Sequence, residues 1–149
     1  MCETRPPRPA AVASIVLVIG VLTAASLWGQ VDRSTVVLDI AVAAVSVPVA
    51  LAQLWWPASG AIAATVLAAV SPVATPAATM GALQVAQRRR FPVAVGVAAA
   101  GIAAHLVQGL WRPNSGISLG WWLLLVCVAY GALLGWGALA RSRRALVIS

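Results

Sequence analysis

The sequence predicts an all-α, multi-spanning transmembrane helix bundle with about five spans, and three observations lead to this prediction. The chain has 149 residues, of which 62% are hydrophobic and 9% are charged, whereas a soluble domain carries about 25% charged residues. Five apolar runs follow one another, each close to the length of about 20 residues that crosses a bilayer core. Arginine and tryptophan residues gather at the ends of these runs, as is typical of membrane–water interfaces.

The expected elements follow the apolar runs in order. A polar, proline-rich tail of residues 1–9 precedes a transmembrane domain of residues 10–140. Its spans are expected at about 10–28, 36–54, 61–85, 92–110 and 121–140. The first run also fits the apolar core of a secretory signal peptide. We favour a span, because cleavage would put the later arginine clusters on the wrong membrane face.

An internal repeat links two pairs of spans. The segments LWWPASG (54–60) and LWRPNSG (110–116) share the pattern L-W-x-P-x-S-G. The chain is therefore interpreted as one N-terminal helix plus two tandem helical hairpins. Common origin and convergence on residues that suit interfacial turns both explain the pattern. In either case we expect both turns on the same membrane side, since two spans separate them.

The distribution of arginine predicts the orientation. With the N-terminus outside and five spans, seven arginines lie inside and three outside. The predicted cytoplasmic anchors are Arg88, Arg89, Arg90, Arg141, Arg143 and Arg144. The positive-inside rule therefore favours a multi-pass protein of the cell membrane with a cytoplasmic C-terminus. In a rival model the first apolar run does not cross the membrane, and nine arginines lie inside. This model leaves that apolar run outside the hydrocarbon core, which is unfavourable.

Two ionisable residues lie within predicted spans and are candidates for sensing, because such residues are costly at membrane depth. His105 is the single histidine of the chain, and Asp39 lies near the inner boundary of the second span. Each also has a structural interpretation, which we favour. The imidazole of His105 would bond a neighbouring helix, and the carboxylate of Asp39 would pair with Arg33 or Arg88.

Proline and glycine mark two further features of the predicted spans. Pro72 and Pro76 should kink the third span, because proline removes a backbone donor and clashes with the preceding turn. The kink would be either a fixed bend or a hinge. Gly131 and Gly135 form a GxxxG motif that permits close helix contact. This contact would form either within one chain or in a homodimer through the last span.

The last helix is expected to continue beyond the membrane. Residues 138–149 contain no glycine or proline and are mostly good helix formers. We therefore expect the helix of the fifth span to reach at least Ala145, with the final three or four residues frayed. The alternative is a helix that ends at Arg141, followed by a disordered tail.

No motif predicts catalysis, a metal or a cofactor. The sequence has no catalytic triad, phosphate-binding glycine loop or zinc motif, and Cys2 and Cys127 form no CxxC pair. The pI is about 11.6, but the arginines end apolar runs and form no patch with interleaved aromatics. We therefore expect a bilayer-embedded chain that is not an enzyme and binds no nucleic acid.

Five motifs, in this order, resemble the N-terminal membrane-sensor region of bacterial two-component sensor histidine kinases. They are SPVATPAAT (71–79), VAQRRR (85–90), HLVQGLWRP (105–113), GWWLLL (120–125) and GWGALARSRRAL (135–146). In that family the last span continues into a phosphoacceptor domain and an ATP-binding domain. The resemblance implies a membrane input module that signals through its last helix to a cytoplasmic kinase or regulator partner, with residues 141–149 as the start of a signalling helix.

The sequence ends before any phosphoacceptor or ATP-binding motif of that family. It is therefore interpreted as a truncated input module, a remnant or a free-standing sensor-like protein. A small integral membrane protein with a structural or partner-binding role is the main alternative. A transporter is disfavoured, because few polar residues are present to line a path.

The purified chain in detergent should neither bind ATP nor phosphorylate itself, because it carries no nucleotide-binding motif. Retention of radiolabelled ATP on a filter measures binding. Covalent label that is lost on acid treatment measures autophosphorylation on histidine. Acid-labile phosphate on His105 would contradict the expectation.

Overall fold

The computed structural model describes residues 8–29, 34–112 and 117–148. In these residues the chain forms six α-helices, one short 3-10 helix and no strand, which confirms the predicted all-α class. The elements, in order, are α1 (Pro9–Trp28), α2 (Val36–Ala52), α3 (Pro57–Val70), η1 (Pro72–Ala74), α4 (Thr75–Arg88), α5 (Phe91–Trp111) and α6 (Leu119–Ile148).

Three of the helices, α1, α5 and α6, are long and apolar enough to cross a membrane. The outer surface of the bundle is also apolar, with Leu17, Val37 and Val128 exposed by 67%, 77% and 62%. In water this surface would be unfavourable, whereas lipid tails solvate it well. These features are those of a membrane protein.

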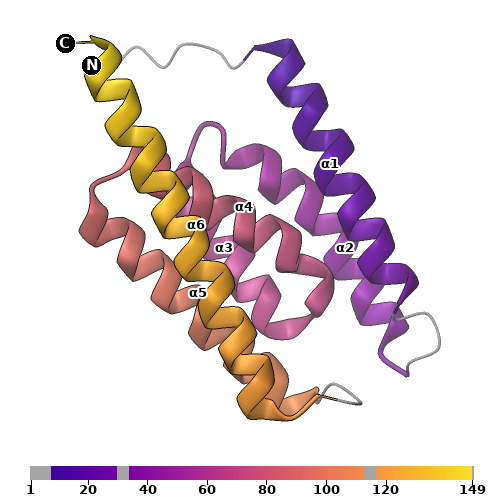
Figure 1. Cartoon of the computed structure of the whole chain (residues 1–149). Helices are drawn as coiled ribbons and strands as arrows, with labels where there is room; N and C mark the ends of the chain where they lie inside the picture. Colours follow the sequence, from indigo (N-terminus) through magenta and orange to yellow (C-terminus); the bar gives the residue numbers. More distant parts are fainter. Residues whose placement is uncertain (1–7, 30–33, 113–116, 149) are drawn as a thin grey trace.

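The predicted single span at residues 61–85 is wrong. The chain forms two short helices there, α3 and α4, which reverse direction through η1 (Figure 1). Pro72 opens η1 and Pro76 lies in the first turn of α4, so the prolines start new helices and do not kink one. Proline suits a first turn, because the N–H that it lacks would have no partner there.

The α3–α4 hairpin is too short to be two ordinary spans. Each helix has 14 residues and is thus about 21 Å long at 1.5 Å per residue. The hydrocarbon core is roughly 30 Å thick. The tip of the hairpin, residues 71–74, lies within the bundle, because Ser71, Val73 and Ala74 are fully buried.

Contacts between distant residues define the two ends of the bundle. At one end, Arg88 donates to the carbonyl of Leu54 at 3.2 Å, and Arg141 donates to the carbonyl of Arg89. We call this the arginine-rich end. At the other end, Asp39 near the start of α2 forms an ion pair with Arg112 just after α5. We call this the ion-pair end.

The reversal at η1 corrects the predicted topology. The two L-W-x-P-x-S-G segments were expected on the same side, but Leu54 lies at the arginine-rich end and Arg112 at the ion-pair end. Thr35 lies beside Arg112, so the turn before α2 and the turn before α5 also lie at opposite ends. Residues 113–116 of the second segment are outside the described residues.

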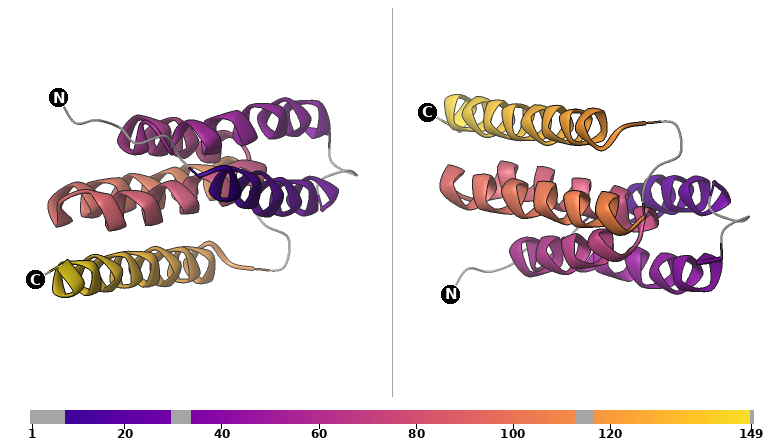
Figure 2. Two further views of the ribbon diagram at one scale, coloured as in Figure 1. Left: turned by 90° about the horizontal axis from the view of Figure 1, so that it is seen from above. Right: turned by 90° about the horizontal axis from the view of Figure 1, so that it is seen from below.

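Small residues let the α3–α4 hairpin occupy the middle of the bundle. Figure 2 shows α6 on one face of the bundle and α2 on the opposite face. Both hydrophobic clusters that hold the helices together contain alanines of the hairpin with at most 2% exposure: Ala61 and Ala82 in one, and Ala64, Ala68, Ala74, Ala77 and Ala78 in the other. A Cβ at Gly81 would lie 2.9 Å from Ala61. Such close backbone approach is how helices pack in lipid.

The last helix continues as the sequence predicts. α6 is unbroken from Leu119 to Ile148, so the expectation that it passes Arg141 and reaches at least Ala145 is confirmed. The expected fraying of the final three or four residues is wrong, because Leu146 and Val147 are helical. The alternative of a helix that ends at Arg141 is excluded.

Cysteines at the exposed positions Ser59 and Ser118 should be labelled from opposite faces of the membrane, because they lie at opposite ends of the bundle. The experiment uses a membrane-impermeant maleimide on intact cells and on inverted vesicles, with Cys2 and Cys127 replaced by serine. Labelling of both positions from one face would contradict the topology described here.

Candidate functional site

A buried ion pair forms the first candidate site. Arg112 Nη1 donates to Asp39 Oδ1 at 2.7 Å and Nη2 donates to Oδ2 at 2.9 Å. The side chains of Asp39 and Arg112 are 0% and 5% exposed. This bidentate geometry is the strongest hydrogen-bonding arrangement of an arginine with a carboxylate. Asp39 also lies in the first turn of α2, where the helix dipole favours a negative charge.

Two hydroxyl groups complete the bonding of this ion pair. Ser71 Oγ donates to Asp39 Oδ1 at 2.6 Å, and Thr35 Oγ1 accepts from Arg112 Nη2 at 2.6 Å. Thr35 Oγ1 also lies 3.4 Å from Asp39 Oδ2. A buried charge pair needs such additional bonds to offset its desolvation. These hydrogen bonds hold α2, the hairpin tip and α5 together. We call this group of residues, Thr35, Asp39, Ser71 and Arg112, the ion-pair latch.

Residues at the end of α5 also bond the carbonyls that the hairpin reversal frees. Trp111 Nε1 donates to the carbonyl of Ala69 at 2.8 Å, and Arg112 Nη1 lies 3.5 Å from the carbonyl of Val70. Ser71 Oγ accepts from the backbone N–H of Val73. Buried backbone groups outside a helix require such partners.

The partner of Asp39 was predicted wrongly. Arg88, one expected partner, bonds the carbonyl of Leu54 at the far end of the bundle, and Arg33, the other, is outside the described residues. The prediction assumed one span at 61–85, which put Arg112 on the opposite face. The Ser-Pro and Thr-Pro pairs at 71–72 and 75–76 were the available signal, because such pairs are typical of helix starts.

His105 forms the second candidate site, in the interior between α4, α5 and α6. It is 1% exposed. Its Nδ1 bonds the carbonyl of Gly101 at 2.7 Å, and its Nε2 lies 3.2 Å from Thr75 Oγ1. A carbonyl only accepts, so Nδ1 carries a proton, and Nε2 shares a hydrogen bond with the Thr75 hydroxyl. His105 thus bonds a neighbouring helix, as its structural interpretation predicts.

Two aromatic side chains of α6 contact His105. Tyr130 meets the imidazole edge-on with ring centroids 5.6 Å apart, and Trp122 Nε1 donates to the His105 carbonyl at 3.3 Å. Tyr130 is 2% exposed, and its hydroxyl finds no partner in the described part of the chain. Gly101 makes room for the tyrosine, because a Cβ there would overlap its ring.

A cavity of about 210 Å³ adjoins these aromatic rings. It lies between α4, α5 and α6, and its lining residues are Thr75, Thr79, His105, Trp122, Leu125, Val126, Ala129 and Tyr130. Leu125 is 54% exposed on the outer surface of the bundle. His105, the only histidine of the chain, and α6, which extends to the arginine-rich end, therefore line the same cavity.

The two glycines of the GxxxG motif of α6 face away from the rest of the described chain. A Cβ at Gly131 or Gly135 would meet nothing within 4 Å, whereas one at Gly137 would overlap Ala86 of α4. Gly137 is therefore the glycine that lets α6 approach α4. The alternative in which Gly131 and Gly135 make contacts within one chain is wrong.

Comparison with known proteins gave no match among protein-family models, curated proteins or solved structures. The two sites described above are therefore interpreted from their own geometry.

Replacing Arg112 with leucine should destabilise the protein by about 3–5 kcal/mol, because Asp39 would keep a buried charge without its partner. The double change Asp39→Leu with Arg112→Leu should cost less, since no charge remains. Unfolding in detergent with increasing dodecyl sulfate measures the stability. Arg143→Leu, at an exposed position, is the control. A double variant as unstable as Arg112→Leu would contradict this account.

Proposed function

We propose that this chain is a membrane-embedded sensor module, similar to the input region of a sensor histidine kinase, that passes a signal through α6. The observation that carries the proposal is the continuity of α6. One helix of 30 residues holds Trp122 and Tyr130 against His105 and also carries Arg141, Arg143 and Arg144 at the opposite end of the bundle. Movement at the His105 cavity would therefore be transmitted along a rigid rod.

The distribution of charge supports a cytoplasmic position for the output end. Among the described arginines, only Arg112 lies at the ion-pair end, and seven lie at the arginine-rich end: Arg8, Arg88, Arg89, Arg90, Arg141, Arg143 and Arg144. The positive-inside rule then puts this end in the cytoplasm. In this arrangement α1, α2, α5 and α6 cross the membrane, and α3–α4 is a re-entrant hairpin.

α6 packs against both α4 and α5 along one side of the helix. Its close contact with α4 is at Gly137, and its contacts with α5 centre on Trp122 and Tyr130. Many of its other side chains, such as Leu124, Val128 and Trp136, face outward. On the inner side of α6, Val126 and Tyr130 belong to the core cluster formed with α4 and α5, and Leu133 and Leu134 pack against it. A change at the His105 cavity would therefore reach α6 directly.

In a chimera with an intact histidine-kinase output, Asp39→Asn should change the autophosphorylation rate, because it weakens the latch that holds the hairpin. Inserting Gly-Gly after Ala140 should abolish this effect, since glycine breaks the rigid connection. The measurement is phosphate incorporation in membranes, at matched expression of each variant.

The control for the insertion is two turns of alanine, about seven residues, which keep the helix rigid and nearly in phase. This control should preserve the effect of Asp39→Asn. A chimera that responds equally with Gly-Gly and with alanine would contradict transmission through α6.

A partner-binding role is the second candidate, favoured by the outward-facing Gly131 and Gly135. Cys127 lies one turn before Gly131 on the same side of α6 and is exposed. A homodimer through this surface would bring the two copies of Cys127 close together.

Oxidation of native membranes should therefore produce a disulfide-linked dimer through Cys127, in a chain with Cys2 replaced by serine. Gly131→Leu with Gly135→Leu should reduce the dimer several-fold, because the helices could no longer approach. Gly20→Leu, also at a position with nothing within 4 Å, is the matched control. Equal dimer yields in the two variants would exclude this interface.

A further inference from the structure

The positive charges of the arginine-rich end have no carboxylate beside them in the described part of the chain. Asp39 is the one acidic residue among the described residues, and it bonds Arg112 at the opposite end of the bundle. Like charges held close together repel one another and attract groups of opposite charge. The arginine-rich end therefore presents a strongly positive surface that is suited to an anionic partner.

Four of these arginines come from two segments that lie side by side, and we call them the arginine cluster: Arg89, Arg90, Arg141 and Arg144. Arg89 and Arg90 form the turn between α4 and α5, and Arg141 donates to the carbonyl of Arg89. Gly137 marks the face of α6 that lies against α4. Arg141 and Arg144 follow Gly137 by one and two helical turns, so they lie on this same face.

The outer part of the arginine cluster is open to a ligand. Figure 1 shows α6 continuing past the turn between α4 and α5, which places Arg144 beyond this turn. Arg89, Arg90 and Arg144 are exposed, and no hydrogen bond within the described residues engages their side chains. Guanidinium groups bind phosphate strongly, because two parallel N–H groups match two phosphate oxygens. The cluster thus offers several such donors to one phosphate group.

The surface beside the arginine cluster is apolar. Phe91 directly follows Arg90, and Phe91 and Val95 lie one turn apart on α5 with 50% and 40% exposure. α5 is one of the helices long and apolar enough to cross a membrane, so this face leads from the cluster into the hydrocarbon core. A soluble anion or an acidic peptide would leave the apolar face uncovered. A phospholipid matches both parts of the surface.

We propose that the arginine cluster binds the phosphate headgroup of one anionic phospholipid, of the phosphatidylglycerol type, whose acyl chains lie along Phe91 and Val95. Basic side chains between membrane helices are suited to such headgroups. A zwitterionic headgroup binds less well, because it brings an ammonium group that the arginines repel. The lipid would join α5 to α6 at the membrane surface. This binding is independent of the signalling role, since it is measured on the chain alone.

The test is native mass spectrometry of the purified chain in detergent, titrated with phosphatidylglycerol or with phosphatidylcholine of the same acyl chains. This method resolves each bound lipid and gives the dissociation constant of the first one. Phosphatidylglycerol should bind several-fold more tightly than phosphatidylcholine. Arg144→Gln should weaken the binding of phosphatidylglycerol about fivefold, as expected for one arginine near an anionic headgroup, and should leave phosphatidylcholine unchanged.

The matched control is Arg143→Gln, which removes the same charge from an exposed position. Arg143 lies about 200° around the helix from Arg141, so it faces away from the turn and should have less than a twofold effect. Equal effects of the two variants, or equal affinities for the two lipids in the unmodified chain, would overturn the proposal and indicate only general attraction to a positive end.

Two soluble anions without acyl chains, glycerol phosphate and a tetraglutamate peptide, distinguish the lipid from other occupants. At the concentration of the lipid, neither should displace phosphatidylglycerol from the unmodified chain. Displacement by glycerol phosphate would assign the cluster to a soluble phosphate compound, and displacement by the peptide would assign it to an acidic protein. Either result would contradict a lipid site.

Discussion

The fold depends on bonding the polar groups of a chain reversal inside an apolar bundle. The tip between α3 and α4 exposes carbonyls that a continuous helix would have bonded, and lipid tails offer them no partner. Trp111 Nε1 and Arg112 Nη1 supply donors from the end of α5, and Ser71 bonds both Val73 and Asp39. The ion pair thus has a structural reason: Asp39 keeps the guanidinium in place, and the guanidinium helps to close the tip.

The same tip links the two candidate sites. Ser71 bonds the ion pair, and Thr75, four residues later, bonds His105. A rearrangement of the latch would therefore displace Thr75 and change the surroundings of His105. Tyr130 and Trp122 pack on that histidine from α6. A contiguous series of contacts thus connects the ion-pair end with the helix that reaches the arginine-rich end, and the proposed signalling function would use this connection.

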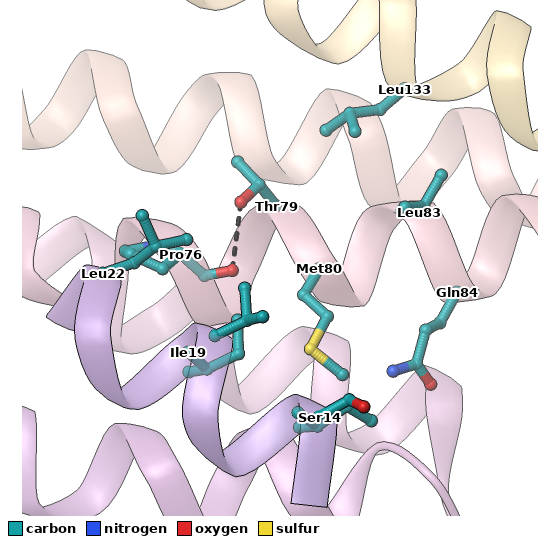
Figure 3. A pocket seen from close by; sticks show the side chains of 11 residues that line it. Ser14, Ile19, Leu22, Pro76, Thr79, Met80, Leu83, Gln84 and Leu133 are labelled. Carbon is teal, nitrogen blue, oxygen red and sulfur yellow. Dashed lines mark hydrogen bonds between the residues drawn. The ribbon is translucent and has the colours of Figure 1, made fainter. Parts of the chain in front are cut away.

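Packing differs between the centre of the bundle and its periphery. The hairpin uses alanine and glycine to pack closely, so its neighbours fit tightly around it. α1 and α6, at the periphery, leave the His105 cavity and an apolar groove beside Gln84 (Figure 3) between them and α4. Thr79 lines both of them.

The sequence by itself determined the helical class and most helix positions. The predicted spans 10–28 and 92–110 agree closely with Pro9–Trp28 and Phe91–Trp111, because the length of an apolar run directly reflects the thickness that it must cross. The unbroken last helix was equally predictable, since residues 138–149 contain no breaker. Ionisable residues at membrane depth also identified Asp39 and His105 as the centres of the two sites, because each such residue needs a partner there.

Only the tertiary structure decided how the stretch 61–85 folds and which partners Asp39 and His105 have. A long apolar run with two prolines is compatible with one kinked span and with two short helices. The choice depends on whether the freed polar groups of the tip find partners. Those partners, Trp111 and Arg112, come from about forty residues further along the chain, so no local pattern could reveal them.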